Sequence, residues 1–121
     1  MALTVTGFSA ATLDYKIVHQ SAASGTMDGN VTGSSGKLFY LTCTNGDSGN
    51  VVYLKVTTAA SSVVADTPAI KIRISASTTE TIVMPDGLRF TELSFYLTTV
   101  QANGVTQTNP GGTSTITAIT S

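Results

Sequence analysis

Charged residues and long apolar runs are both scarce in this 121-residue chain. Charged side chains make up 11% of it and the formal net charge is −1. We therefore expect no binding to nucleic acid or to an anionic membrane surface, which needs a clustered basic excess. No apolar stretch reaches the roughly 18 residues that a membrane-spanning helix requires. No charged segment with an apolar core follows Met1 as in a secretory signal, so we expect a chain made in the cytoplasm.

Cysteine is almost missing too, and the single Cys43 excludes an intrachain disulfide. It lies in the apolar run of residues 38–43. We therefore expect a small buried hydrophobic side chain there, in place of a reactive thiol.

Side chains that usually carry catalysis are few and dispersed. His19 is the only histidine, and the sequence places no nucleophile or acid beside it. The seven acidic residues occur singly, without the pair that a glycosidase needs. No serine lies in a Gly-x-Ser-x-Gly motif. The sequence therefore predicts a protein that is not an enzyme, with no catalytic residue and no cofactor.

Residues 45–50 (Asn-Gly-Asp-Ser-Gly-Asn) superficially resemble a calcium loop, because oxygen-bearing side chains recur at alternate positions. The loop supplies one carboxylate, whereas calcium sites usually take several. A hairpin loop that joins strands at residues 37–44 and 51–57 explains the same residues. We expect the hairpin and no metal site.

Hydroxyl side chains dominate what is present, with 22 threonines and 13 serines. Threonine, valine, isoleucine, tyrosine and phenylalanine together make up about 40% of the chain, and these side chains favour strands. With so few charges, the surface must rest on uncharged hydroxyl groups. Such a surface can be buried against protein at a smaller desolvation cost than a charged one, and it also suits contact with carbohydrate.

Alternating apolar and polar residues predict an all-β fold, and no segment shows a convincing helical period. The clearest example has Ile70, Ile72 and Ile74 on one face with Lys71 and Arg73 on the other. We expect a small antiparallel β-sandwich of about seven or eight strands, jelly-roll or Ig-like, with a closed barrel as the alternative. The predicted strands lie at residues 14–19, 37–44, 51–57, 69–75, 80–84, 88–90, 93–100, 105–108 and 114–120, and a sharp turn at Pro85-Asp86-Gly87 separates two of them.

The chain is long enough for one domain in all, with two regions of different texture. Residues 1–36 are expected to form an N-terminal arm or the first strands, followed by a loose Gly/Ser-rich loop, and residues 37–121 the body of the sandwich. The apolar runs at residues 3–8 and 13–19 either pair within the domain or add a strand to a partner's sheet. The predicted core consists of Val52, Leu54, Val56, Ile70, Ile72, Ile74, Phe95 and Leu97.

Short motifs between residues 37 and 99 follow one another in a particular order: NVVYLKV at 50–56, TPA at 67–69, IKI at 70–72, SASTT at 75–79, GLRF at 87–90, and Leu93-Ser94. In this order the stretch resembles small virion structural proteins of tailed bacteriophages, especially phages of aquatic bacteria. The family usually has a second glycine where this chain has Glu92.

The resemblance implies a β-sandwich on the virion, most simply a capsid decoration (cement) protein made in the host cytoplasm. Such proteins commonly sit as trimers on the outer capsid surface and tie neighbouring capsomers together. The implied partners are the major capsid protein and further copies of the chain, and no catalytic residue is implied. We expect partner contacts in the N-terminal region, at Leu3, Val5, Phe8, Leu13, Tyr15 and Ile17.

Two other functions fit the same residues. A tail-fibre or receptor-binding module for a host surface glycan predicts a shallow site lined by exposed aromatics such as Tyr15, Tyr40, Tyr53 and Tyr96, although no tryptophan is present to stack on a sugar. A subunit of a bacterial surface fibre is the third alternative, and the missing export signal disfavours it.

Overall fold

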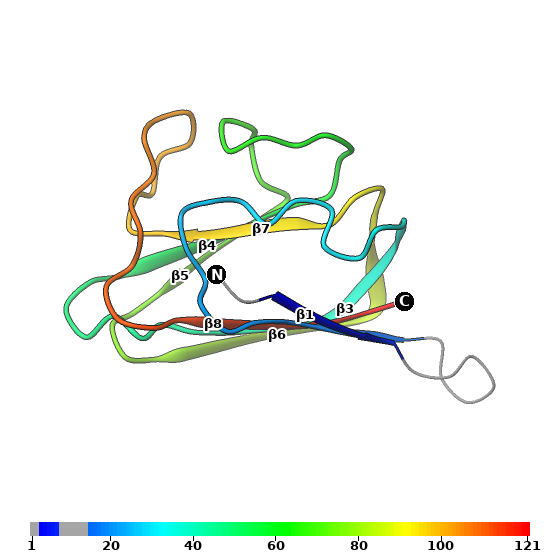
Figure 1. The fold of residues 1–121 in the computed structure, drawn as a ribbon, viewed down its shortest axis with the longest axis horizontal. Helices are drawn as coiled ribbons and strands as arrows, with labels where there is room; N and C mark the ends of the chain where they lie inside the picture. The colour runs from blue at the N-terminus through cyan, green and yellow to red at the C-terminus, as the bar shows by residue number, and fades with distance from the viewer. Residues whose placement is uncertain (1–2, 8–14) are drawn as a thin grey trace.

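The computed structural model describes residues 3–7 and 15–121. In this part of the chain, β-strands are the only regular secondary structure. Eight strands form two antiparallel sheets that pack face to face, which confirms the predicted small β-sandwich (Figure 1). Within those residues, no helix is long and apolar enough to cross a membrane.

The two sheets differ in size. In Figure 1 the larger sheet is the lower layer and the smaller one lies above it. The larger sheet has the order β1 (Leu3–Gly7), β2 (Lys16–Gln20), β8 (Thr115–Thr120), β3 (Gly36–Thr44), β6 (Thr79–Phe90), and the smaller has the order β5 (Ile70–Ile74), β4 (Val52–Thr57), β7 (Ser94–Thr98).

The hydrophobic core fills the space between the sheets and contains the predicted residues. Ile70 and Ile72 are partly buried and pack against it. The other six predicted residues are 0% exposed. Cys43 is also in the core, as predicted, and burial raises the pKa of its thiol to about 12. Further members that the sequence analysis did not single out are Val18, Val31, Leu38, Leu41, Phe90, Leu93, Ile116 and Ala118.

The predicted hairpin at residues 45–50 is wrong. Its two flanking strands lie in different sheets, with β3 beside β6 and β8, and β4 beside β5 and β7. Both strands bury one face, so placing them on opposite sides of the core satisfies both patterns. The Asn45 side chain fixes the crossing by donating hydrogen bonds to the carbonyl oxygens of Asn50 and Ile74, at 2.9 and 3.3 Å. Gly46 packs so closely that a Cβ there would lie 1.7 Å from the Thr113 oxygen.

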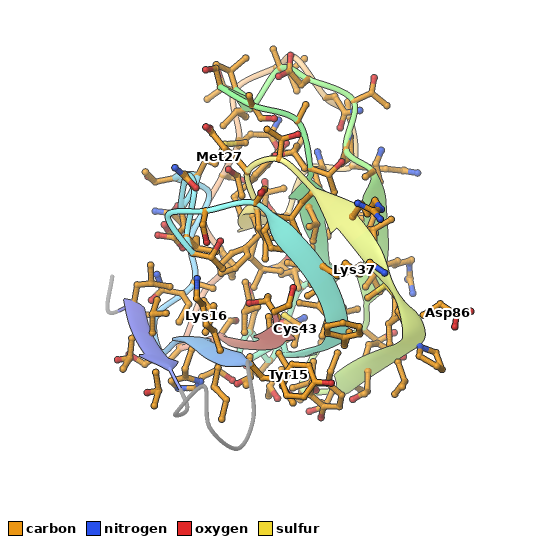
Figure 2. The ribbon with its side chains drawn as sticks, turned by 90° about the vertical axis from the view of Figure 1, so that its right-hand side faces the viewer. Tyr15, Lys16, Met27, Lys37, Cys43 and Asp86 are labelled. Atoms are coloured by element: carbon orange, nitrogen blue, oxygen red, sulfur yellow. The ribbon has the colours of Figure 1, made fainter. Side chains whose placement is uncertain are left out.

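The predicted turn at Pro85-Asp86-Gly87 does not end a strand, because β6 runs through it. The register with β3 passes from Leu38 to Tyr40 on one strand while four residues, 84–87, are taken up on the other. Such a bulge absorbs turn-forming residues and bends the strand without breaking the pairing on either side. Figure 2 shows Asp86 projecting from the bend.

Two loops lie over the outer face of the three-stranded sheet and bury Lys55 and Tyr96 there, while Lys71 and Arg73 on the edge strand β5 stay exposed as their alternation suggests. Residues 58–69 and 99–113 form the green and orange loops above this sheet in Figure 1. The Tyr96 hydroxyl donates to the Val64 oxygen at 3.0 Å. Lys55 is 0% exposed and donates from Nζ to the Ala102 oxygen at 2.8 Å. The strand predicted at residues 105–108 is not formed.

The Gly/Ser-rich segment after β2 has no strand of its own but is bonded along the edge of β7. Asp28 and Phe95 exchange two backbone hydrogen bonds, at 2.9 and 3.1 Å, and the Val31 amide donates to the Leu93 oxygen. Asp28 and Val31 are buried, and the Asp28 carboxylate accepts a bond from Gln20 at 2.9 Å. The segment is therefore a loop, but it is not loose, because it is hydrogen-bonded to β7 and buries two side chains.

Candidate docking face

The described chain leaves the outer face of the five-stranded sheet open. In Figure 1 no described segment lies below this sheet, whereas loops cover the other one. Alternation in β8 sends Ile116 and Ala118 into the core and turns Thr115, Thr117 and Ile119 outward. The pairing of β8 with β2 and β3 then sets which residues line up beside them.

The side chains of this face stand in three rows across the strands, and we call these rows together the docking face. The apolar row is Thr6, Ile17, Ile119, Tyr40 and Val83; the first hydroxyl row is Thr4, His19, Thr117, Thr42 and Thr81; the second hydroxyl row is Thr115, Thr44 and Thr79.

The hydroxyl rows come from a repeated local pattern. Four of the five strands carry Thr-x-Thr, and residues two apart in a strand share a face. The four pairs are Thr4 and Thr6, Thr42 and Thr44, Thr79 and Thr81, and Thr115 and Thr117.

Several polar groups of the docking face are already hydrogen-bonded to one another. The hydroxyls of Thr42 and Thr81 lie 2.9 Å apart, and those of Thr44 and Thr79 lie 2.8 Å apart. His19 Nδ1 lies 2.8 Å from the Thr117 hydroxyl. Covering the face would leave these groups with partners, so its desolvation costs less than that of unpaired polar groups.

Asp, Glu, Lys and Arg are missing from all three rows of the docking face, and His19 is their one titratable side chain besides Tyr40. Ionised groups are the most costly to bury without a partner. An uncharged face with internally bonded hydroxyls and one apolar row is therefore suited to burial against another protein.

An aromatic contact adjoins the apolar row. The rings of Tyr15 and Phe39 meet edge to face, with centroids 5.5 Å apart and planes at 81°. Phe39 is the residue at the register shift between Leu38 and Tyr40. Figure 2 shows Tyr15 on the lower, outer side of the larger sheet, where its side chain is 40% exposed.

The described residues among those predicted to contact a partner lie on two different sides of the larger sheet. Ile17 is on the docking face and Tyr15 is beside it. Leu3 and Val5 are 40% and 43% exposed on the edge strand β1, but they point to the other side of the sheet, because Val5 pairs with buried Val18. Phe8 and Leu13 lie outside the described residues.

The four tyrosines predicted to line a glycan site do not meet. Tyr40 is on the docking face and Tyr15 lies near it. Tyr53 is half-buried on the outer side of the smaller sheet, and Tyr96 is 1% exposed. Tyr96 therefore cannot stack on a ligand, and the predicted set is wrong as a single site.

The loop that resembles a calcium loop uses its carboxylate to bind N–H groups. Asp47 accepts from the amides of Gly49 and Asn50 at 2.9 and 3.1 Å, and from that of Gly111 at 2.7 Å. These donors, the Gly49 amide first, hold the pKa of Asp47 below its usual value. No group of three or more possible metal ligands occurs within residues 3–7 and 15–121.

Comparison of the chain with models of protein families, with curated proteins and with solved structures finds no match.

Proposed function

We propose that this protein is a non-enzymatic virion structural protein of a tailed bacteriophage, a capsid decoration protein that binds the outer capsid surface. Its partners would be the major capsid protein and two further copies of itself in a trimer. The single observation that carries the proposal is the docking face, whose three rows contain no Asp, Glu, Lys or Arg and whose polar groups are in part hydrogen-bonded to one another. The motifs between residues 37 and 99 that resemble such phage proteins support the same assignment.

The proposal assigns a mechanical role to the docking face. Strands lie about 4.8 Å apart, so five of them span roughly 24 Å, a width suited to bridging between neighbouring subunits. Specific interfaces commonly bury about 800 Å² per partner. Many copies on one particle, held together as trimers, would multiply a modest contact through avidity.

Binding to capsids that lack the protein tests the proposal. Thr117 lies on the central strand β8, and Thr117→Lys would bury an unpaired charge at the contact. We expect its affinity for such capsids, measured by co-sedimentation, to fall by at least about tenfold. The matched control is Thr106→Lys in the exposed loop over the smaller sheet, which should bind like the unmodified chain.

Retention of full affinity by Thr117→Lys, with an unchanged circular dichroism spectrum, would reject the docking face as the capsid contact. Equal loss in the Thr106→Lys control would reject it as well, because that residue lies on the other side of the sandwich.

A glycan-binding tail-fibre module is the second candidate, favoured by Tyr15, Phe39 and Tyr40 at one side of the docking face. Aromatic rings beside hydroxyl groups are typical of sugar contacts. Copy number distinguishes the two candidates: a decoration protein would occur in hundreds of copies per particle and a fibre module in tens or fewer.

A further inference from the structure

A cleft opens at the end of the sandwich where β4 and β6 finish. It has a volume of about 560 Å³ and shares no residue with the docking face. The lining residues are Ser35, Gly36, Lys37, Thr58, Ala59, Arg89, Phe90 and Thr91. This size lies in the range of small-molecule sites, which is about 300–1,000 Å³.

Two of the six cationic residues of the chain line this cleft, side by side. Lys37 and Arg89 are direct partners in the pairing of β3 with β6. The Arg89 side chain makes no hydrogen bond or ion pair with any residue that the structure describes, and Lys37 Nζ donates only to the Asp86 backbone oxygen, at 3.5 Å. No carboxylate lines the cleft. The residues that line the cleft therefore carry a net positive charge.

Uncommitted hydroxyl groups lie next to these cations. The side-chain hydroxyls of Ser35, Thr58 and Thr91 have no hydrogen-bond partner among the described residues. Phe90, which is 5% exposed, and Ala59 add a small apolar area to the same lining. The cleft thus combines cations, hydroxyl groups without a described partner and an apolar area in its lining.

We propose that this cleft binds a sugar that carries an anionic group, a carboxylate or a phosphate. The Arg89 guanidinium offers a planar pair of donors to the oxyanion, and Lys37 adds a second positive charge. The three hydroxyls exchange hydrogen bonds with those of the sugar, and Ala59 contacts its C–H groups. Such an activity goes beyond capsid decoration, since it would let the protein hold an anionic saccharide.

The test is a titration of the full chain, followed by backbone NMR shifts, with four probes: D-glucuronate, D-glucose 6-phosphate, D-glucose and acetate. We expect the two charged sugars to bind at least about tenfold more tightly than glucose or acetate, with shifts centred on the cleft. The one that binds more tightly identifies the preferred oxyanion. Binding should weaken as sodium chloride is raised.

Two variants assign the contact to its residues. Arg89→Gln removes an exposed cation that has no partner among the described residues, so the fold should be kept and binding should fall at least about tenfold. The matched control is Arg73→Gln on β5, an exposed arginine of the other sheet, which should leave binding unchanged. Equal binding of glucose and the charged sugars, no binding of any probe at millimolar concentration, or full binding by Arg89→Gln would each overturn the proposal. Capsid binding is a separate readout, so either proposal can fail without the other.

Discussion

At the scale of single residues, the carboxylate of Asp47 ties two loops together, because it accepts hydrogen bonds from Gly49 in its own loop and from Gly111 in the loop before β8. Gly111 lets the backbone come close, since a Cβ there would lie 3.1 Å from Asp47 Oδ2, and Asn45 adds hydrogen bonds at the same crossing. The resemblance of this loop to a calcium loop therefore reflects an acceptor for N–H groups.

This role of Asp47 predicts a loss of stability in acid. Its pKa is held below the usual 3.8, first by the Gly49 amide and then by that of Gly111. A lowered pKa gives a stabilisation that is present above pH 3.8 and is lost as the pH falls through the folded-state value. We expect Asp47→Asn to lower the melting temperature at pH 7 and to flatten its decline below pH 4, whereas Asp86→Asn, at an exposed position, should change neither. A wild-type pH profile in Asp47→Asn would contradict this.

Because the Cys43 thiol is buried, we expect the folded protein to lose stability at alkaline pH. Burial raises its pKa from 9.0 to about 12. The unfolded chain then releases this proton before the folded chain does, so stability falls as the pH rises from 9.0 towards 12, by about 1.4 kcal/mol per pH unit. Over this range, the unfolding free energy of the unmodified chain, measured by urea denaturation, should fall relative to that of Cys43→Ala, because only the unmodified chain titrates a thiol. A pH-independent difference between the two would show that the thiol ionises equally in both states.

At the scale of elements, the bulge in β6 depends on Gly87, whose φ is +76°. A Cβ at this position would lie 2.8 Å from Phe39 Cε1. Gly104 has nearly the same φ, +74°, but nothing lies within 4 Å of its Cβ position. Comparing substitutions at Gly87 and Gly104 therefore distinguishes the cost of backbone strain from the cost of side-chain contact.

We expect Gly104→Ala to cost about 1 kcal/mol of unfolding free energy, from the left-handed backbone alone. Gly87→Ala should cost more, about 2–4 kcal/mol, because the Phe39 ring must move as well. Urea denaturation measures both. Equal costs would mean that the bulge adapts without strain.

Much of the strand pattern could be predicted from local alternation, and the pairing could not. The alternation of Ile70, Ile72 and Ile74 predicts β5 directly, and the Thr-x-Thr pairs are visible in the sequence. The pairing of β8 between β2 and β3 joins residues 71 to 104 positions apart, which no local pattern encodes. The burial of Lys55 and Tyr96 was missed for a related reason, since the covering loops are set by the fold as a whole.

At the scale of the whole molecule, the two outer faces of the sandwich differ in how far loops cover them. Loops lie over part of the outer side of the smaller sheet, while no described segment covers the outer side of the larger sheet. The docking face exists only because Thr117 lines up with Thr42 and Thr81 across three strands. The sequence predicted a hydroxyl-rich surface, and its gathering into rows required the topology.

A density map of whole particles, at a resolution that places strands, tests the central claim most directly. The account predicts hundreds of copies on the outer capsid, each with the five-stranded sheet turned to the major capsid protein and with Thr42, Thr117 and Ile119 buried in the contact. Copies bound through the loops over the three-stranded sheet, or a location confined to the tail, would contradict it.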